Sequence, residues 1–264
     1  MKELLLRTLT GVTLILIVAG SILLGPETFT AILLLVYLLA VKELYELLQK
    51  RGLSVRWFRA IPGALLLILA YVVFQFGLSL FWLLLPPGLW LITALRGGIT
   101  LSGTLAFLWL AVPLSSLSAL GWVEDYGRYQ YAFPLTIIAL IWINDTFAYI
   151  VGSLLGRHKM TPVLSPGKTW EGFAGGMLFT LVAGWLSWRL TGLGTMWAWF
   201  GISLLVTLLG LAGDLFESGL KRTVKVKNTG GLLPGHGGVL DRFDSMLFVA
   251  PAVLILVILL KLIR

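Results

Sequence analysis

The sequence predicts an all-α polytopic membrane protein, and three observations support this class. Its 264 residues are 58% hydrophobic and only 12% charged, whereas a typical soluble domain carries about 25% charged residues. Apolar stretches of roughly 20 residues, long enough to cross a bilayer as a helix, recur along the whole chain. The Lys and Arg residues gather in a few short loops between these stretches.

About nine transmembrane helices are expected in one integral membrane domain. Residues 1–131 hold the first five and residues 132–264 hold the last four. The segment KELYELLQKRG extends the short second span as an amphipathic helix, and Pro86-Pro87 should kink or break the fourth. The spans lie near 8–25, 28–41, 60–76, 78–95, 99–122, 132–151, 172–190, 195–213 and 246–263.

The basic residues predict the orientation of these spans. With nine spans, sixteen Lys and Arg residues fall on one side of the membrane and four on the other. Loops rich in Lys and Arg stay cytoplasmic, so the N-terminus is expected inside and the C-terminus outside. The two polar loops, 152–171 and 214–245, then face the cytoplasm and are the expected catalytic loops.

The composition excludes several kinds of site. The chain has no cysteine, which rules out disulfides and thiolate chemistry, and its two histidines, His158 and His236, are far apart in sequence. A divalent metal would therefore rest on carboxylates, which favours Mg²⁺. The net charge of +8 suits anionic lipids or anionic substrates, and no nucleic-acid recognition module is present.

Four aspartates are candidate metal ligands. Asp145 and Asp214 lie at the inner ends of the sixth and eighth spans, where the alternative is simple pairing with a nearby Lys or Arg. Asp241 and Asp244, in DRFD, share one face if they form the first turn of the last span. The alternative for this second pair is helix capping, since a helix N-terminus stabilises anions.

The segment DLFESGLKRTVK predicts a helix that continues into the cytoplasm. Asp214, Ser218, Lys221 and Lys225 would share one face of it, as a metal carboxylate followed by cations for phosphate. The alternative is a solvated face in which Glu217 and Lys221 form an exposed i, i+4 pair.

Two further loops offer phosphate contacts. In PGHGG the glycines permit close approach of the backbone, whose N–H groups can cradle phosphate. In LSPGKTWEG the candidates are Ser165, Lys168 and Thr169, with a plain turn as the alternative. This segment is not a P-loop, because Pro162 stands where that motif requires glycine.

The motifs as a set resemble the signature of the phosphatidate cytidylyltransferases, also called CDP-diacylglycerol synthases. The resemblance rests on Ser218, Lys221-Arg222, Lys227, Gly230, Pro234, HGG at 236–238 and DRFD at 241–244, with further similarity in SPGKTWEGFAGG and NDTFAYIVGSLLGR. The N-terminal half matches only as generic membrane helices. Where the family has an acidic residue after the lysine, this chain has Asn228.

The resemblance implies an enzyme that joins CTP and phosphatidate to give CDP-diacylglycerol and pyrophosphate with one or two Mg²⁺ ions. The implied catalytic residues are Asp214, Asp241, Asp244 and Lys227. The three aspartates are also implied metal ligands, and Asp145 is a further candidate. Asn228 occupies the position where the family has an acidic residue, and its uncharged amide would be a weaker metal ligand. The implied phosphate contacts are Ser218, Lys221, Arg222, His236, Gly237, Gly238, Arg242, Ser165, Lys168 and Thr169.

The implied location is the inner (cytoplasmic) membrane of a bacterium, with the active site facing the cytoplasm and no nucleic-acid partner. Two other functions are compatible with parts of the pattern: a CTP-dependent polyprenol or lipid kinase, and a cation-coupled transporter. Small-residue spacings such as Gly172…Gly176 permit close helix packing, either within one chain or in a homodimer.

Overall fold

The computed structural model describes residues 2–123, 128–235 and 237–262. Two compact units emerge. The first comprises residues 1–134 with 223–243, and the second comprises 135–222 with 244–264. The first boundary lies close to the predicted division after residue 131, while part of the second polar loop groups with the first unit.

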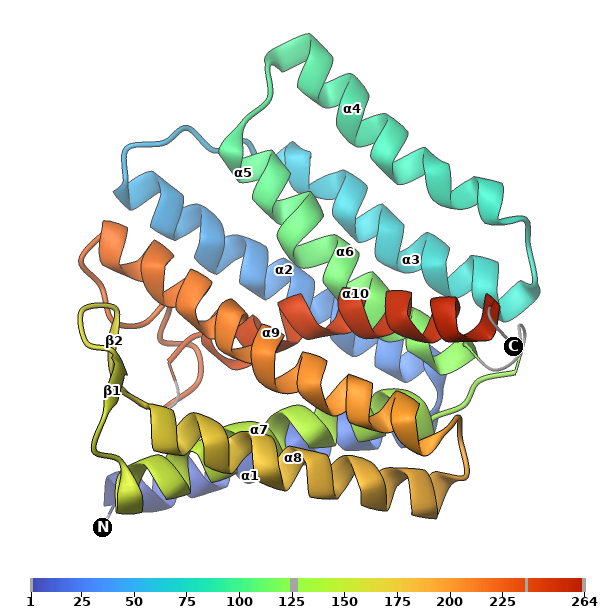
Figure 1. Cartoon of the computed structure of the whole chain (residues 1–264). Coiled ribbons are helices and arrows are strands. Elements are labelled where there is room, and N and C mark those ends of the chain that lie inside the picture. The colour runs from blue at the N-terminus through green and yellow to red at the C-terminus, as the bar shows by residue number, and fades with distance from the viewer. Residues whose placement is uncertain (1, 124–127, 236, 263–264) are drawn as a thin grey trace. The chain divides into compact units, whose positions relative to one another are not determined.

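The first unit is built from helices separated by short 3₁₀ turns (Figure 1). Its second helix continues through KELYELLQK to Lys50, as the sequence predicts. The elements are α1 (Lys2–Leu24), α2 (Pro26–Lys50), η1 (Trp57–Ala60), α3 (Ile61–Phe76), η2 (Leu80–Leu84), α4 (Leu85–Gly97), α5 (Leu101–Thr104), the π-helical η3 (Leu105–Ala111), α6 (Val112–Ala119) and η4 (Leu120–Trp122).

The core of this unit lies between α2, α3 and the η3–α6 helix. Tyr37 of α2 is fully buried and its hydroxyl donates to the carbonyl of Ala60 at 2.8 Å. Gly63 lets α3 approach α2 and η3 closely: a Cβ there would lie 2.6 Å from the ring of Tyr37 and 2.8 Å from the Cβ of Ala111. Such contacts leave no room for a side chain.

The fourth predicted span changes from a 3₁₀ turn to an α-helix close to Pro86-Pro87. The chain forms the 3₁₀ turn η2 first, and the α-helix α4 then begins with the prolines in its first turn. Proline is tolerated there because the first N–H groups of a helix have no intrahelical acceptor. η2 and α4 follow one another without an intervening loop, so the helix changes type near the prolines and the predicted kink or break stays a prediction.

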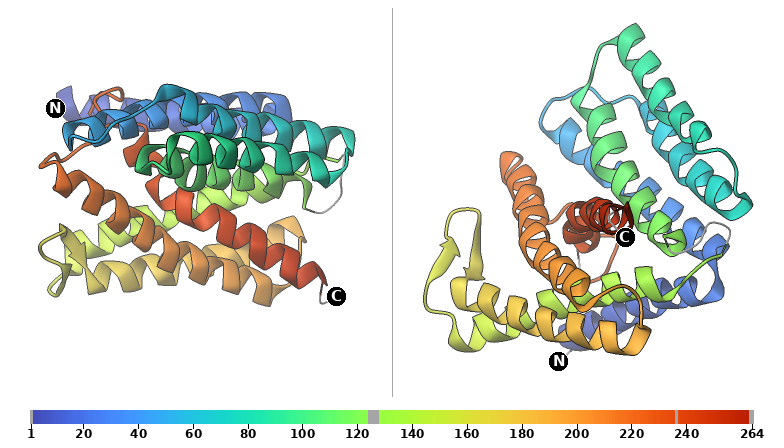
Figure 2. Two further views of the ribbon diagram at one scale, coloured as in Figure 1. Left: turned by 90° about the horizontal axis from the view of Figure 1, so that it is seen from above. Right: turned by 45° about the vertical axis from the view of Figure 1, so that its right-hand side comes forward.

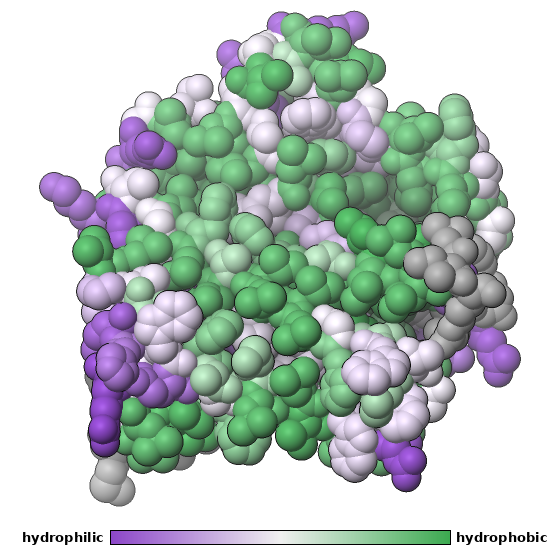
Figure 3. Space-filling view, viewed as in Figure 1, coloured by the Kyte–Doolittle hydropathy of each residue, from purple (hydrophilic) through white to green (hydrophobic). Residues whose placement is uncertain are grey.

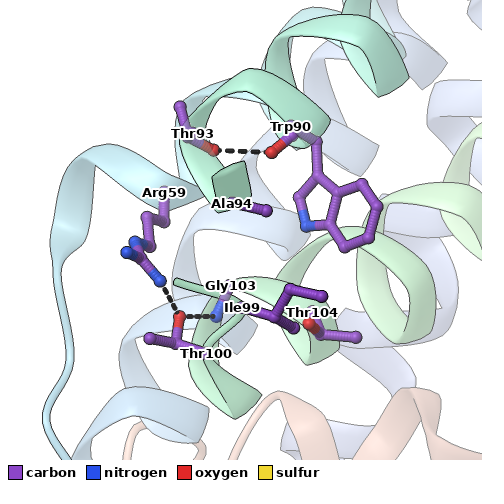
Figure 4. A pocket seen from close by; sticks show the side chains of 8 residues that line it. All are labelled: Arg59, Trp90, Thr93, Ala94, Ile99, Thr100, Gly103 and Thr104. Atoms are coloured by element: carbon purple, nitrogen blue, oxygen red, sulfur yellow. Dashed lines mark hydrogen bonds between the residues drawn. The ribbon is translucent and has the colours of Figure 1, made fainter. Parts of the chain in front are cut away.

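Arg59, one of the basic residues between the second and third predicted spans, is 3% exposed and binds the turn between α4 and α5. Its guanidinium donates to the carbonyls of Gly97 and Gly98 at 2.8 and 2.9 Å and to the hydroxyl of Thr100 (Figure 4). The adjoining pocket leaves only about 10 Å³ for the centre of a water molecule, which is room for one water. It is too small for a nucleotide.

The second unit contains four long helices and one short hairpin (Figure 1). Its antiparallel strands pair Lys159 with Thr169 and Thr161 with Ser165, a feature that the sequence reading did not predict. The elements are α7 (Ala132–Leu155), β1 (Lys159–Thr161), β2 (Ser165–Thr169), α8 (Trp170–Thr191), α9 (Met196–Thr223) and α10 (Leu240–Leu262).

Glycines bring α7 and α8 together, and the two helices lie side by side in both views of Figure 2. A Cβ at Gly172 would lie 2.6 Å from the carbonyl of Ala148, and one at Gly175 would lie 2.6 Å from Val151. Phe147 and Phe179 stack between the helices with centroids 3.8 Å apart. The close packing predicted for the small residues of α8 therefore occurs within one chain.

The fold is that of an all-α polytopic membrane protein, as predicted. Hydrophobic side chains cover much of the surface seen in Figure 3, where a soluble protein would expose charge. α1, α2 and α8 coincide with the other predicted spans, so the count of nine stays a prediction. Within the described residues six segments are long and apolar enough to cross a membrane: Trp57–Phe76, Leu80–Gly97, Leu101–Trp122, Ala132–Leu155, Met196–Thr223 and Leu240–Lys261.

The close contact at Gly63 gives a first prediction. Gly63→Ala should destabilise the protein by about 1–3 kcal/mol, because the new methyl group overlaps Tyr37 and Ala111. Thermal unfolding in detergent, followed by tryptophan fluorescence, measures this. Gly88→Ala is the control, since a Cβ at that helical glycine meets nothing within 4 Å. Equal melting temperatures for the two variants would contradict the packing described for α3.

Candidate active site

In the second unit, α9 carries Asp214 on the part of the helix that ends at Thr223. The ammonium of Lys168, from β2, lies 2.5 Å from Oδ2 of Asp214. The hydroxyl of Ser218, one turn further along α9, donates to Oδ1 at 3.3 Å. Candidate residues from two separate motifs, Asp214 and Ser218 from one and Lys168 from the other, therefore meet. The pairing of Asp214 with a nearby cation, an alternative from the sequence, is also confirmed.

Asp244 of α10 lies close to the same part of α9. A Cβ at Gly213 would lie 2.5 Å from the carbonyl oxygen of Asp244, so the helix backbones nearly touch there. Asp244 also lies within the electrostatic reach of the Asp214 and Asp145 carboxylates and of the Lys221 ammonium. Like charges this near one another favour binding of a cation.

The predicted i, i+4 pairing of Glu217 with Lys221 is confirmed, but the pair is buried and does not lie on a solvated face. The ammonium of Lys221 lies 2.6 Å from Oε2 of Glu217, and both side chains are buried. A buried ion pair is costly to break, because removal of either partner leaves a charge without its counter-ion. The predicted helical face also ends early: α9 stops at Thr223, and Lys225 has a left-handed backbone with φ of 55°.

The hairpin holds the predicted phosphate contacts Ser165, Lys168 and Thr169 on one strand. Thr169 is buried, and its hydroxyl accepts from the N–H of Gly172 at 3.1 Å, which caps α8. This capping role was not predicted.

At the base of the hairpin, Nδ1 of His158 lies 2.6 Å from Oε1 of Glu171. The Oε2 atom of Glu171 accepts from the N–H of Arg157 at 3.1 Å. The hydrogen bond from His158, together with backbone donors, lowers the pKa of the Glu171 carboxyl to about 2. Glu171 therefore remains a hydrogen-bond acceptor for the hairpin throughout the physiological pH range.

In the first unit, the loop before α10 is organised around Asp241. Since α10 begins at Leu240, Asp241 lies in its first turn, as the sequence reading supposed. Oδ2 of Asp241 accepts from the N–H groups of Gly238 at 2.8 Å and Thr229 at 3.0 Å. A carboxylate that reaches back to an earlier N–H is a common helix start, so the capping alternative holds for Asp241.

Glu43 of α2 completes this loop and was missed by the sequence reading. Its side chain is 6% exposed and accepts from the N–H groups of Val239 and Leu240, each at 2.9 Å. The N–H groups of Gly238, Val239 and Leu240 thus donate to protein carboxylates. Of these three residues, only Gly238 was a predicted phosphate contact. The only sequence signal was a charged residue on the amphipathic part of α2.

The remaining predicted residues are distributed over both units. Lys227 and Asn228 are exposed in the first unit, and Asn228 lies beside Gly237, whose Cβ would be 3.4 Å from its side chain. Arg222 and Asp145 are exposed in the second unit, and Arg242 is exposed on α10. His236 lies outside the described residues.

The donor set suits magnesium only together with phosphate. Among the described residues, no group of three or more Asp, Glu or His side chains forms a site that could hold a metal ion. Mg²⁺ is usually bound by one or two carboxylates plus substrate phosphates and water, rather than by a complete protein cage. Asp214 and Asp244, with lysines nearby, fit that second arrangement.

The fold is that of a membrane protein with a group of acidic and basic side chains on α9, α10 and the hairpin. The pattern of the Cytidylyltransferase family matches residues 5–260. Similar proteins include the phosphatidate cytidylyltransferase of Staphylococcus haemolyticus, 34% identical over 96% of this chain and 98% of that protein. That of Staphylococcus aureus strain COL is 44% identical over 48% of this chain and 49% of that protein. The chain belongs to the cytidylyltransferase family and is a nucleotidyltransferase.

The α9–α10 contact gives a second prediction. Gly213→Ala should force the helices apart at Asp244 and lower the melting temperature by several degrees, which corresponds to about 1–3 kcal/mol of overpacking. Gly210→Ala, one turn earlier, is the matched control, because its Cβ would lie 3.7 Å from the Cβ of Ser245, an ordinary contact. If both variants unfold at the wild-type temperature, the described contact at Gly213 is wrong.

Proposed function

We propose that the chain condenses CTP with phosphatidate to give CDP-diacylglycerol and pyrophosphate. The observation that carries this proposal is the group formed in the second unit by Asp214, Asp244, Lys168 and Lys221. Carboxylates and lysines at one end of a membrane helix pair suit a substrate that carries several phosphates. The name of the similar staphylococcal proteins supplies phosphatidate as the second substrate.

The proposed reaction is a direct displacement. A phosphate oxygen of phosphatidate attacks the α-phosphorus of CTP, a new P–O bond forms, and the bond between the α-phosphorus and the bridging oxygen breaks to release pyrophosphate. The attacking phosphate monoester needs no general base, because the second pKa of such a group is about 6. No covalent enzyme intermediate is required.

Asp214 and Asp244 are the proposed magnesium ligands, with Asp145 as a further candidate and Asp241 retained through its place in the family signature. When bound, Mg²⁺ supplies charge neutralisation for the triphosphate and for departing pyrophosphate. Lys168 is paired with Asp214, and it would bind a phosphate when a cation takes its place beside that carboxylate. The exposed Arg222, Lys227 and Arg242 are proposed phosphate contacts.

The proposed setting is a bacterial cytoplasmic membrane, with the site on the cytoplasmic side. The helices of the chain and its bacterial relatives support membrane integration. The side follows from the excess of Lys and Arg in one set of loops and from the cytoplasmic supply of CTP.

A turnover assay tests this function. Purified protein in detergent, with phosphatidate and α-labelled CTP, should form labelled lipid and an equal amount of pyrophosphate only when Mg²⁺ is present. Asp214→Asn and Asp244→Asn should each lower turnover at least about 100-fold, a loss typical for an electrostatic group at a reacting phosphate. Glu46→Gln, which removes a carboxylate from α2 in the first unit, is the control for loss of a negative charge. Release of CDP in place of pyrophosphate would indicate a kinase and overturn the proposal.

Asn228 gives a separate prediction about metal affinity. Its side chain and the carboxyl of Asp241 both lie against Gly237, so Asn228→Asp places a second carboxylate beside the first. The concentration of Mg²⁺ for half-maximal turnover should fall several-fold, because two adjacent anions bind a cation more tightly than one. Without magnesium the melting temperature should fall, because the two neighbouring carboxylates repel each other. A titration unchanged from the wild type would exclude a metal at this position.

A further inference from the structure

The carboxylate of Glu43 is deeply buried and held by one loop. Oε1 accepts from Val239 N–H, and Oε2 accepts from Leu240 N–H and from the hydroxyl of Thr229, each at 2.9 Å. Among the described residues, every hydrogen bond of this carboxylate comes from the segment between Thr229 and Leu240. A buried charge is tolerated only when its hydrogen bonds are satisfied, so the position of Glu43 and the conformation of this loop depend on each other.

The glycines of the loop make this contact possible. A Cβ at Gly230 would lie 2.6 Å from Oε1 of Glu43, and one at Gly238 would lie 2.7 Å from its carboxyl carbon. Neither glycine has a positive φ, so space and not backbone conformation requires glycine at both positions. Two glycines of the family signature are therefore explained by a residue of α2, which lies outside that signature.

The same contact extends to Asp241. The hydroxyl of Thr229 lies 2.9 Å from Oε2 of Glu43 and 3.1 Å from Oδ2 of Asp241. A hydroxyl has a single proton, so the Thr229 hydroxyl can donate to only one of the two carboxylates at a time. Asp241 also accepts from the N–H groups of Thr229 and Gly238. The two carboxylates thus share one framework of donors, which fixes both the start of α10 and the place of Asp241.

We propose that Glu43 is a positioning residue for nucleotidyl transfer: it fixes the glycine loop and the first turn of α10, and through them the Asp241 carboxylate. The proposal rests on the proposed function, because Asp241 is a candidate ligand only in that reaction. Glu43 itself contacts no reacting group in this proposal. Residues that orient metal ligands typically change metal affinity or activity by about 10–100-fold when substituted.

Two matched pairs of variants test the proposal. Glu43→Gln keeps the shape of the side chain but replaces one acceptor oxygen by a donor, so either the Val239 or the Leu240 N–H loses its partner. Glu46→Gln makes the same chemical change one turn later on α2, where no hydrogen bond or ion pair of Glu46 occurs among the described residues. Gly230→Ala crowds Glu43 from the loop side, and Gly231→Ala is its control, since a Cβ there meets nothing within 4 Å.

The expected result has two parts. In Glu43→Gln and Gly230→Ala, hydrogen exchange of peptides within 228–243 should accelerate while exchange in α8 stays unchanged. The kcat should fall by about 10–100-fold and the Mg²⁺ concentration for half-maximal turnover should rise, with the KM for phosphatidate unchanged. Both control variants should stay close to the wild type in every measurement.

Three outcomes would overturn the proposal. Glu43→Gln and Gly230→Ala could match their controls in exchange and turnover. Alternatively, they could lower the melting temperature and the folded fraction while the folded protein keeps the wild-type kcat and magnesium dependence, which would make Glu43 a structural anchor only. If Glu43→Gln does not fold, wild-type kinetics in Gly230→Ala would decide against the proposal. Absence of CDP-lipid from the wild type would instead reject the proposed function, and hydrogen exchange would still test the contact.

Discussion

The cost of burying charge away from water governs the polar parts of both units. A buried ion without a partner costs several kcal/mol, and this chain meets that cost in three different ways. Arg59 donates to backbone carbonyls and a hydroxyl, Glu43 accepts from backbone N–H groups, and Lys221 pairs with Glu217. In each case the partner lies in a turn or at a helix end and itself needs a hydrogen bond or a counter-ion. One contact therefore satisfies both the buried charge and its partner.

Glycine has a corresponding steric role. At Gly63, Gly172 and Gly213 its missing side chain lets helices approach until backbone and side-chain atoms meet. At Gly230 and Gly238 it makes room for a carboxylate. A glycine-rich loop in a nucleotide-handling protein suggests approach of a ligand to the backbone. Here the N–H groups of Thr229, Gly238, Val239 and Leu240 donate to Glu43 or Asp241, and Gly230 and Gly238 make room for Glu43 before any ligand is considered.

The sequence predicts the membrane class and most helices, because hydropathy and helical spacing are local properties. It predicts the start of α10 from DRFD for the same reason. It names Lys168 and Asp214 as separate candidates, and only the fold shows that they meet. The hairpin, the buried state of Lys221 and the role of Glu43 were not predictable in this way. Each depends on what a residue meets in the folded chain, and the partners of Glu43 lie 186 to 197 residues away. No periodicity records a contact of that separation.

That separation has a consequence for biosynthesis. Glu43 leaves the ribosome 186 residues before Thr229, so α2 is synthesised long before the donors of its carboxylate exist. Until they arrive, burial of the ionised carboxylate would leave a charge without hydrogen bonds, which is costly. The carboxyl therefore has to be in water or protonated during this part of translation. Closure of the glycine loop over Glu43 is then among the last steps in the maturation of the first unit.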